Sequence, residues 1–133
     1  MNYHEWETTV KIDHFALEVP NFDQLIGSLT HLGLTLQRVG CKADDSSRRI
    51  AMIRDKSGFK IEIIEGENIE FSHFAVKVES INELHKRLVT ESNYNEVKSL
   101  RRLSAAKAYT SLVADPSGLM VQLVRYDPDS PDL

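Results

Sequence analysis

The sequence contains the same strand-like stretch twice, and this repeat restricts the possible folds more than any other feature. Residues 12–19 read IDHFALEV and residues 71–78 read FSHFAVKV. A shift of 59 positions places His14 on His73 and aligns the Phe-Ala pair that follows each histidine. In both copies large apolar residues occupy every second position, which is typical of a β-strand with one apolar face. The histidine of each copy belongs to the opposite face.

A second match extends the repeat to the ends of the two copies. The turn sequence Asp55-Lys56-Ser57-Gly58 returns as Asp115-Pro116-Ser117-Gly118. The strand-like stretches after these turns carry Glu62 and Gln122 at equivalent positions. Each copy therefore has the same order of elements from its first strand to its last.

This order predicts an α+β fold made of two βαβββ modules in tandem, residues 10–66 and residues 69–126, within one domain, 1–133. Each module has only one sheet face to place under its helix. Side by side, the modules are expected to form a curved mixed sheet, a half-barrel with an inner cleft and with the helices outside.

Four local signals complete the expected elements. Asn21 is predicted to cap a helix that ends before Gly33, and Ser80 is predicted to open the second helix with a capping box. The polar stretch 41–47 is predicted to be a loop. Residues 127–133 are acidic and rich in proline, so we expect a frayed tail.

The composition narrows the possible partners and the cellular location. A net charge of −4 with mixed signs argues against a continuous basic surface for nucleic acid. The single cysteine, Cys41, forms no internal disulfide, which favours a reducing compartment. The polar start, residues 1–8, does not resemble a signal peptide, and no apolar run predicts a membrane span. We expect a cytoplasmic protein that binds neither nucleic acid nor membrane.

The alternation of the strands gathers four polar side chains on the inner face. His14 and His73 project to the face opposite the large apolar residues of their own strands. In the last strand of each module, Glu62 and Gln122 also project to the face opposite the large apolar residues. Imidazole and carboxylate ligands suit a divalent ion such as nickel, cobalt, zinc, manganese or iron. We therefore predict a metal site of His14, Glu62, His73 and Gln122. Lys60, Met120 and Val124 are expected to line the substrate cleft.

The segments DHFALEV, SHFAVKV, DKSGFKIEII and DPSGLMVQLV resemble the vicinal oxygen chelate superfamily, over residues 10–126. This superfamily includes glyoxalase I, methylmalonyl-CoA epimerase, extradiol dioxygenases and bleomycin-binding proteins. The resemblance implies metal ligands on the first and last strand of each module, which here are the four residues named above. In methylmalonyl-CoA epimerase the glutamine belongs to the first module and the glutamate to the second, so this chain has the two exchanged.

Three functions remain open from the sequence. The first is a metal-dependent lyase or isomerase, in which a small substrate chelates the metal through neighbouring oxygens and Glu62 moves a proton. The second is a non-haem iron dioxygenase that uses His14, His73 and Glu62. The third is a metal-free small-molecule binding or resistance protein. Relatives usually form dimers, so we expect a homodimer, with modules paired within one chain or exchanged between chains.

Overall fold

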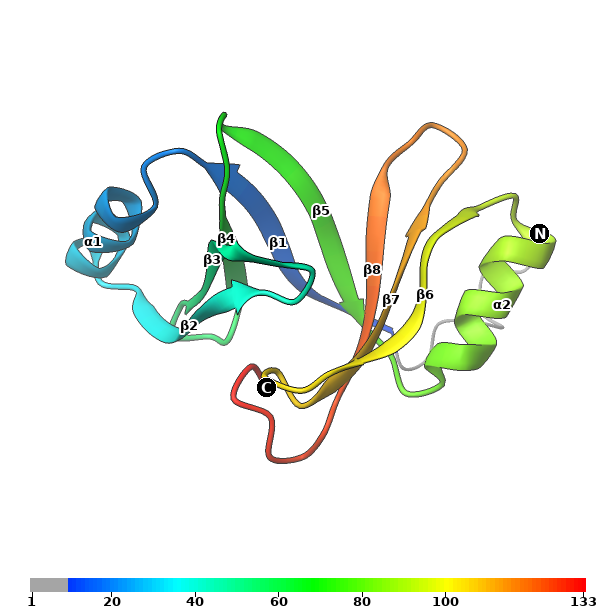
Figure 1. Ribbon diagram of the computed structural model, residues 1–133. Helices are drawn as coiled ribbons and strands as arrows, with labels where there is room; N and C mark the ends of the chain where they lie inside the picture. The colour runs from blue at the N-terminus through cyan, green and yellow to red at the C-terminus, as the bar shows by residue number, and fades with distance from the viewer. Residues whose placement is uncertain (1–9) are drawn as a thin grey trace. The chain divides into compact units, whose positions relative to one another are not determined.

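The structure is a computed structural model that describes residues 10–133, so the predictions for residues 1–8 lie outside the described part. Within these residues, one helix and four strands occur twice in the predicted order (Figure 1). The first set is β1 (Lys11–Val19), α1 (Phe22–Leu32), β2 (Thr35–Lys42), β3 (Asp45–Arg54) and β4 (Lys60–Glu65). The second set is β5 (Glu70–Lys77), α2 (Ile81–Glu91), β6 (Asn95–Leu103), β7 (Ala108–Ala114) and β8 (Met120–Tyr126).

The strands form a mixed sheet in the order β2-β3-β4-β1-β5-β8-β7-β6. The first strand of each set runs parallel to the last, β1 beside β4 and β5 beside β8. The remaining pairs within each set are antiparallel. The predicted α+β class and the two βαβββ modules are therefore confirmed.

The chain divides into two compact units, and the boundary passes through β1 and β5. The first unit contains residues 14–73 together with Asp132. The second unit contains residues 74–131 and Leu133, with residues 10–13 as its described share of β1. β1 and β5 are therefore each divided between the two units.

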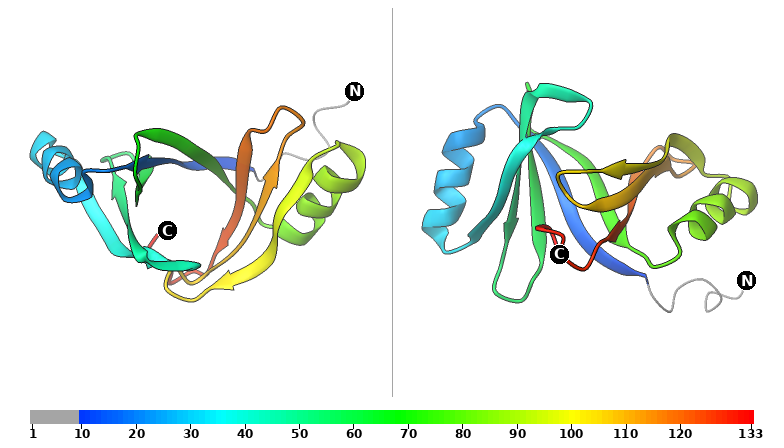
Figure 2. Two further views of the ribbon diagram at one scale, coloured as in Figure 1. Left: turned by 45° about the horizontal axis from the view of Figure 1, so that its top comes forward. Right: turned by 60° about the horizontal axis from the view of Figure 1, so that its bottom comes forward.

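The core of the first unit lies between α1 and its strands (Figure 2). Val19, Ile53 and Ile63 are buried against Phe22, the first residue of α1. The helix ends as predicted before Gly33, whose positive φ of 118° suits a residue without a Cβ. The cap at Asn21 was predicted wrongly, because its side chain makes no capping hydrogen bond, and the same is true of Ser80 before α2.

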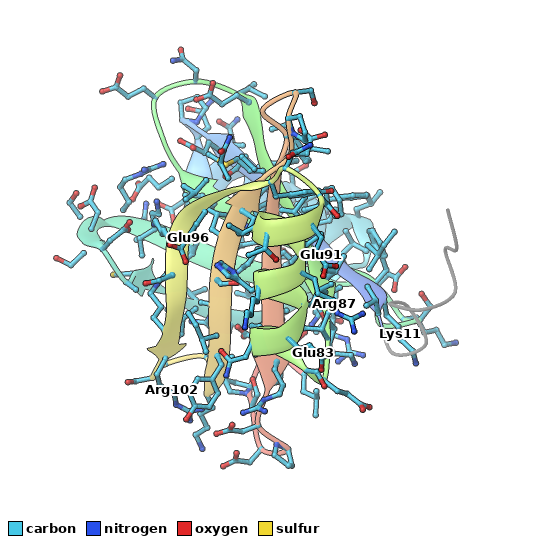
Figure 3. The ribbon with its side chains drawn as sticks, turned by 90° about the vertical axis from the view of Figure 1, so that its right-hand side faces the viewer. Lys11, Glu83, Arg87, Glu91, Glu96 and Arg102 are labelled. Atoms are coloured by element: carbon cyan, nitrogen blue, oxygen red, sulfur yellow. The ribbon has the colours of Figure 1, made fainter. Side chains whose placement is uncertain are left out.

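The core of the second unit lies under α2, which Figure 3 shows in front of β6, β7 and β8. Ile81 of the helix packs with Val78, which follows β5, and with three buried strand residues, Val113, Val121 and Leu123. Phe74 and Val76 adjoin this cluster, so the apolar face of the repeated strand meets the helix as predicted.

In the first unit the equivalent face is covered only in part. Phe15 remains 40% exposed and makes edge contacts with the rings of Phe59 and Phe71, at centroid distances of 5.6 and 6.4 Å. Only the end of β1 near Val19 joins the cluster under α1.

Two further expectations differ from the structure. The stretch 41–47 is mostly strand, because β2 and β3 continue as a hairpin in which Lys42 pairs with Asp45. The segment 127–133 is tied down instead of frayed, since its acidic residues find cationic partners, and Ser130 and Asp132 are buried. Among the described residues no helix is both long and apolar enough to cross a membrane.

Candidate metal centre

Three of the predicted ligands come together within the first unit. His14 lies on β1, Glu62 on β4 and His73 on β5, and one ligand atom from each lies within 4.8 Å of the others. Nε2 of His73 is 3.7 Å from Oε1 of Glu62. The two imidazole rings meet edge to face, with centroids 5.9 Å apart and planes at 73°. Metal bonds to such atoms are about 2.0–2.2 Å long, so this spacing suits a single ion.

Strand register explains why these side chains meet. In the parallel pair of β1 and β4, His14 is opposite Lys60 and Ala16 is opposite Glu62. Opposite residues project to the same face of a sheet, and residues two apart along a strand do so as well. His14, Lys60 and Glu62 therefore share the face that α1 does not cover, as the sequence pattern predicted.

Burial gives the centre its electrostatic character. His14 is 2% exposed, and the side chains of His73 and Glu62 are 14% and 15% exposed. Loss of hydration raises the pKa of the Glu62 carboxyl above its ordinary value, and the charge of His14 opposes this change. Two imidazoles and one carboxylate with restricted access to water make a donor set that fits a divalent ion of the zinc, nickel or iron type.

Gln122, the fourth predicted ligand, lies on β8 in the second unit. Its amide Nε2 donates to Oγ1 of Thr110 at 2.8 Å, and that hydroxyl donates in turn to the carbonyl oxygen of Leu123. This chain of hydrogen bonds orients the amide of Gln122. Its role as a metal ligand stays a prediction.

The three residues expected to line the cleft have different surroundings. Lys60 is 4% exposed, and its ammonium donates to the backbone carbonyl of Asp132. Val124 is buried in a small apolar cluster that includes Ala75. Met120 is half-buried at the start of β8. Their contact with a substrate stays a prediction.

Comparisons with known proteins find the fold in solved structures. No protein-family model matches the sequence, and no curated protein matches it. The methylmalonyl-CoA epimerase from Mycobacterium tuberculosis is 21% identical, with a TM-score of 0.74 over 88% of each chain. A hypothetical protein from Bacillus halodurans C-125 is 20% identical, with a TM-score of 0.73 over 91% of this chain and 97% of that one.

A methylmalonyl-CoA epimerase in complex with methylmalonyl-CoA and NH4+ is 13% identical, with a TM-score of 0.74 over 92% of this chain and 99% of that one. The chain has the fold of these solved structures, which include methylmalonyl-CoA epimerases. At these identities the likeness is one of fold. The chemistry of the candidate metal centre depends on the residues that this chain places there.

Sequence reasoning missed two residues beside the centre. Arg38 on β2 makes a two-pronged ion pair with Asp132, through Nε to Oδ1 at 2.6 Å and Nη2 to Oδ2 at 2.8 Å. The two residues are 94 positions apart in sequence, so no local pattern indicated that they meet. In the sequence, inward positions are indicated only where the alternation of apolar residues occurs in both modules. Neither Arg38 nor Asp132 belongs to such a repeated segment.

The raised pKa of Glu62 predicts a pH-dependent stability for the metal-free protein. The Glu62 carboxyl holds its proton more tightly in the folded state than in the unfolded chain, where its pKa is 4.5. The wild type should therefore lose stability as the pH rises from about 4.5 through the higher pKa of the folded state. Glu62→Gln has no charge to bury, so near neutral pH it should unfold at a higher temperature than the wild type, and the advantage should vanish in acid.

Thermal unfolding of chelator-treated protein across this pH range measures the effect. Glu67→Gln, at an exposed position between β4 and β5, is the matched control and should follow the wild type. An advantage of Glu62→Gln that is equal at acid and neutral pH would contradict the explanation.

Proposed function

We propose that the protein is a metal-dependent isomerase or lyase that acts on a small substrate with two neighbouring oxygens. The observation that carries the proposal is the cluster of His14, Glu62 and His73, three buried or nearly buried ligands within 4.8 Å of one another. The fold likeness to methylmalonyl-CoA epimerases supports an isomerase. By the repeat, Gln122 is proposed as the fourth ligand.

The residues of this chain would divide the work. When bound, a divalent ion supplies positive charge that stabilises negative charge developing on a substrate oxygen. His14 and His73 would hold the ion as neutral imidazoles. Glu62 is the candidate acid–base group, because it is the only carboxylate among the four proposed ligands and a carboxylate can accept and return a proton. The low exposure of all three side chains would keep water from the site.

The proposal is tested first by metal content. Wild-type protein incubated with nickel, cobalt, zinc, manganese or iron(II), and then freed of unbound ions, should retain about one equivalent of at least one of them. Elemental analysis measures this directly. Retention far below one equivalent for every ion would overturn the proposal and favour a metal-free binding protein.

A non-haem iron dioxygenase is the second candidate. The observation in its favour is that the cluster contains two histidines and one carboxylate, the ligand set of many iron(II) oxygenases. Oxygen consumption separates the two candidates. Turnover of a chelating substrate without uptake of oxygen supports the isomerase or lyase, whereas uptake that depends on iron(II) supports the dioxygenase. The homodimer and the cytoplasmic location remain predictions.

A further inference from the structure

A second polar cluster, made of Arg38, Lys60 and Asp132, belongs to the same unit as the metal centre. The guanidinium of Arg38 holds both carboxylate oxygens of Asp132, at 2.6 and 2.8 Å. The ammonium of Lys60 donates to the backbone carbonyl of Asp132. The side chains of Arg38 and Asp132 are only 17% and 4% exposed. The carboxylate of Asp132 is thus held by the largely buried Arg38, and the buried Lys60 contacts the backbone carbonyl of the same residue.

This cluster occupies the same sheet face as the candidate metal ligands. Arg38 on β2 is opposite Met52 on β3, and Met52 is opposite Glu62 on β4. Paired residues on neighbouring strands project to the same face, so Arg38 and Glu62 lie on the same side of the sheet, with β3 between their strands. Lys60 precedes Glu62 by two residues and shares this side. The charges of Asp132 and Arg38 both influence the pKa of Glu62, in opposite directions, which agrees with this proximity.

The arrangement has the chemistry of a carboxylate receptor. A guanidinium binds a carboxylate through two parallel hydrogen bonds, and this geometry does not depend on the molecule that carries the carboxylate. Cations out of water are costly unless an anion accompanies them. The largely buried guanidinium of Arg38 therefore favours an anion in direct contact with it, and the carboxylate of Asp132 makes that contact.

The other acidic residues of the same segment behave differently. Asp127 pairs with Arg102, and Asp129 pairs with Lys107, in ion pairs whose members are all at least one-third exposed. Asp132 alone among these three reaches a largely buried arginine on the face of the metal centre. Exposed ion pairs contribute little to stability, and Asp132 differs from the other two residues in lying on the face that carries the candidate metal ligands.

We propose that Arg38 and Lys60 form a carboxylate-binding subsite beside the metal centre and that Asp132 is its internal occupant. A small organic acid that enters this subsite displaces Asp132. The inference rests on the proposed function, because it names the chemical class of the substrate group next to the chelating oxygens. The wild type is expected to bind carboxylates weakly, since the measured affinity is reduced by the fraction of molecules in which Asp132 has left.

The first test compares the binding of butyrate and its uncharged analogue butyramide, followed by NMR titration of the full-length protein. Asp132→Asn keeps the shape of the side chain and removes its charge. It should bind butyrate at least about tenfold more tightly than the wild type, because the internal competitor is weakened. Butyramide should bind none of these proteins measurably. Asp129→Asn is the matched control, since Asp129 is exposed and pairs with Lys107, and it should behave as the wild type.

A second variant locates the bound carboxylate. Arg38→Met added to Asp132→Asn should abolish the gain in butyrate affinity. Titrations are repeated after dialysis against a chelator, so that a carboxylate on a metal ion is distinguished from one on Arg38. A gain that persists without Arg38, or a change below twofold for Asp132→Asn, would overturn the subsite. Metal retention is measured separately, so either proposal can fail while the other stands.

Hydrogen exchange in the wild type tests the subsite even where Asp132→Asn is poorly folded. Saturating butyrate should accelerate amide exchange in residues 130–133, because displacement of Asp132 releases this segment. Butyramide at the same concentration should leave the exchange unchanged. Unchanged exchange with both compounds would contradict the displacement.

Discussion

Glu62→Gln is expected to lower turnover by about 10²–10⁴-fold, the usual contribution of a general acid–base residue. An amide cannot accept a proton near neutral pH, whereas the carboxylate can. The variant should still retain metal through His14 and His73, because the two imidazoles are unchanged and the amide oxygen occupies nearly the same place. The assay uses the hemithioacetal of methylglyoxal or an epimerisable acyl-CoA, with rates normalised to bound metal.

Gln122→Glu is the matched comparison, since Gln122 occupies the equivalent strand position in the second module. With Gln122 as the proposed fourth ligand, this change makes that ligand negative, so metal binding should be kept or tightened and the rate should fall less than in Glu62→Gln. The assignment of Glu62 fails when Glu62→Gln keeps a near wild-type rate with metal bound. It also fails when Gln122→Glu is the more damaging change at equal metal occupancy.

His73→Ala should remove most of the bound metal. The imidazole of His73 is one of three ligands in the cluster, and its Nε2 is 3.7 Å from the carboxylate of Glu62. Groups that merely orient a ligand typically contribute about 10–100-fold to metal affinity, so removal of a ligand should exceed that. Competition with a chromophoric chelator measures the affinity, and circular dichroism verifies the fold.

His31→Ala is the control for this substitution, because His31 is exposed on α1 and does not belong to the cluster. It should bind metal as the wild type does. Equal affinity of His73→Ala and His31→Ala would place the metal elsewhere and contradict the centre described above.

Much of the fold could be predicted because the signals were local and occurred twice. The alternation in β1 and β5 indicated which side of each strand is apolar, and the Asp-x-Ser-Gly turns marked the start of the last strands. In the structure the two turns are alike in detail, since Asp55 and Asp115 each accept the backbone N–H and hydroxyl of the serine two residues on. Gly58 and Gly118 have φ values of 97° and 95°. A pattern seen twice is harder to produce by chance than either copy.

The errors arose where one local signal stood alone. The polar composition of 41–47 indicated a loop, yet backbone pairing between β2 and β3 extends the hairpin over most of it. Asn21 and Ser80 are favoured capping residues, but neither side chain makes the bond. In both cases tertiary packing overrode a propensity of small free energy.

The sequence by itself determined the two modules, the elements within them and the face on which His14, Glu62 and His73 project. These follow from spacing along the chain, because side-chain direction in a strand depends only on whether a position is odd or even. Only the tertiary structure decided which polar residues meet across strands that are distant in sequence. Arg38 and Asp132 meet because the sheet register places Arg38 on the same face as Glu62, with Met52 of β3 between them, and because a buried guanidinium favours an anion in contact with it. No spacing along the chain contains that information.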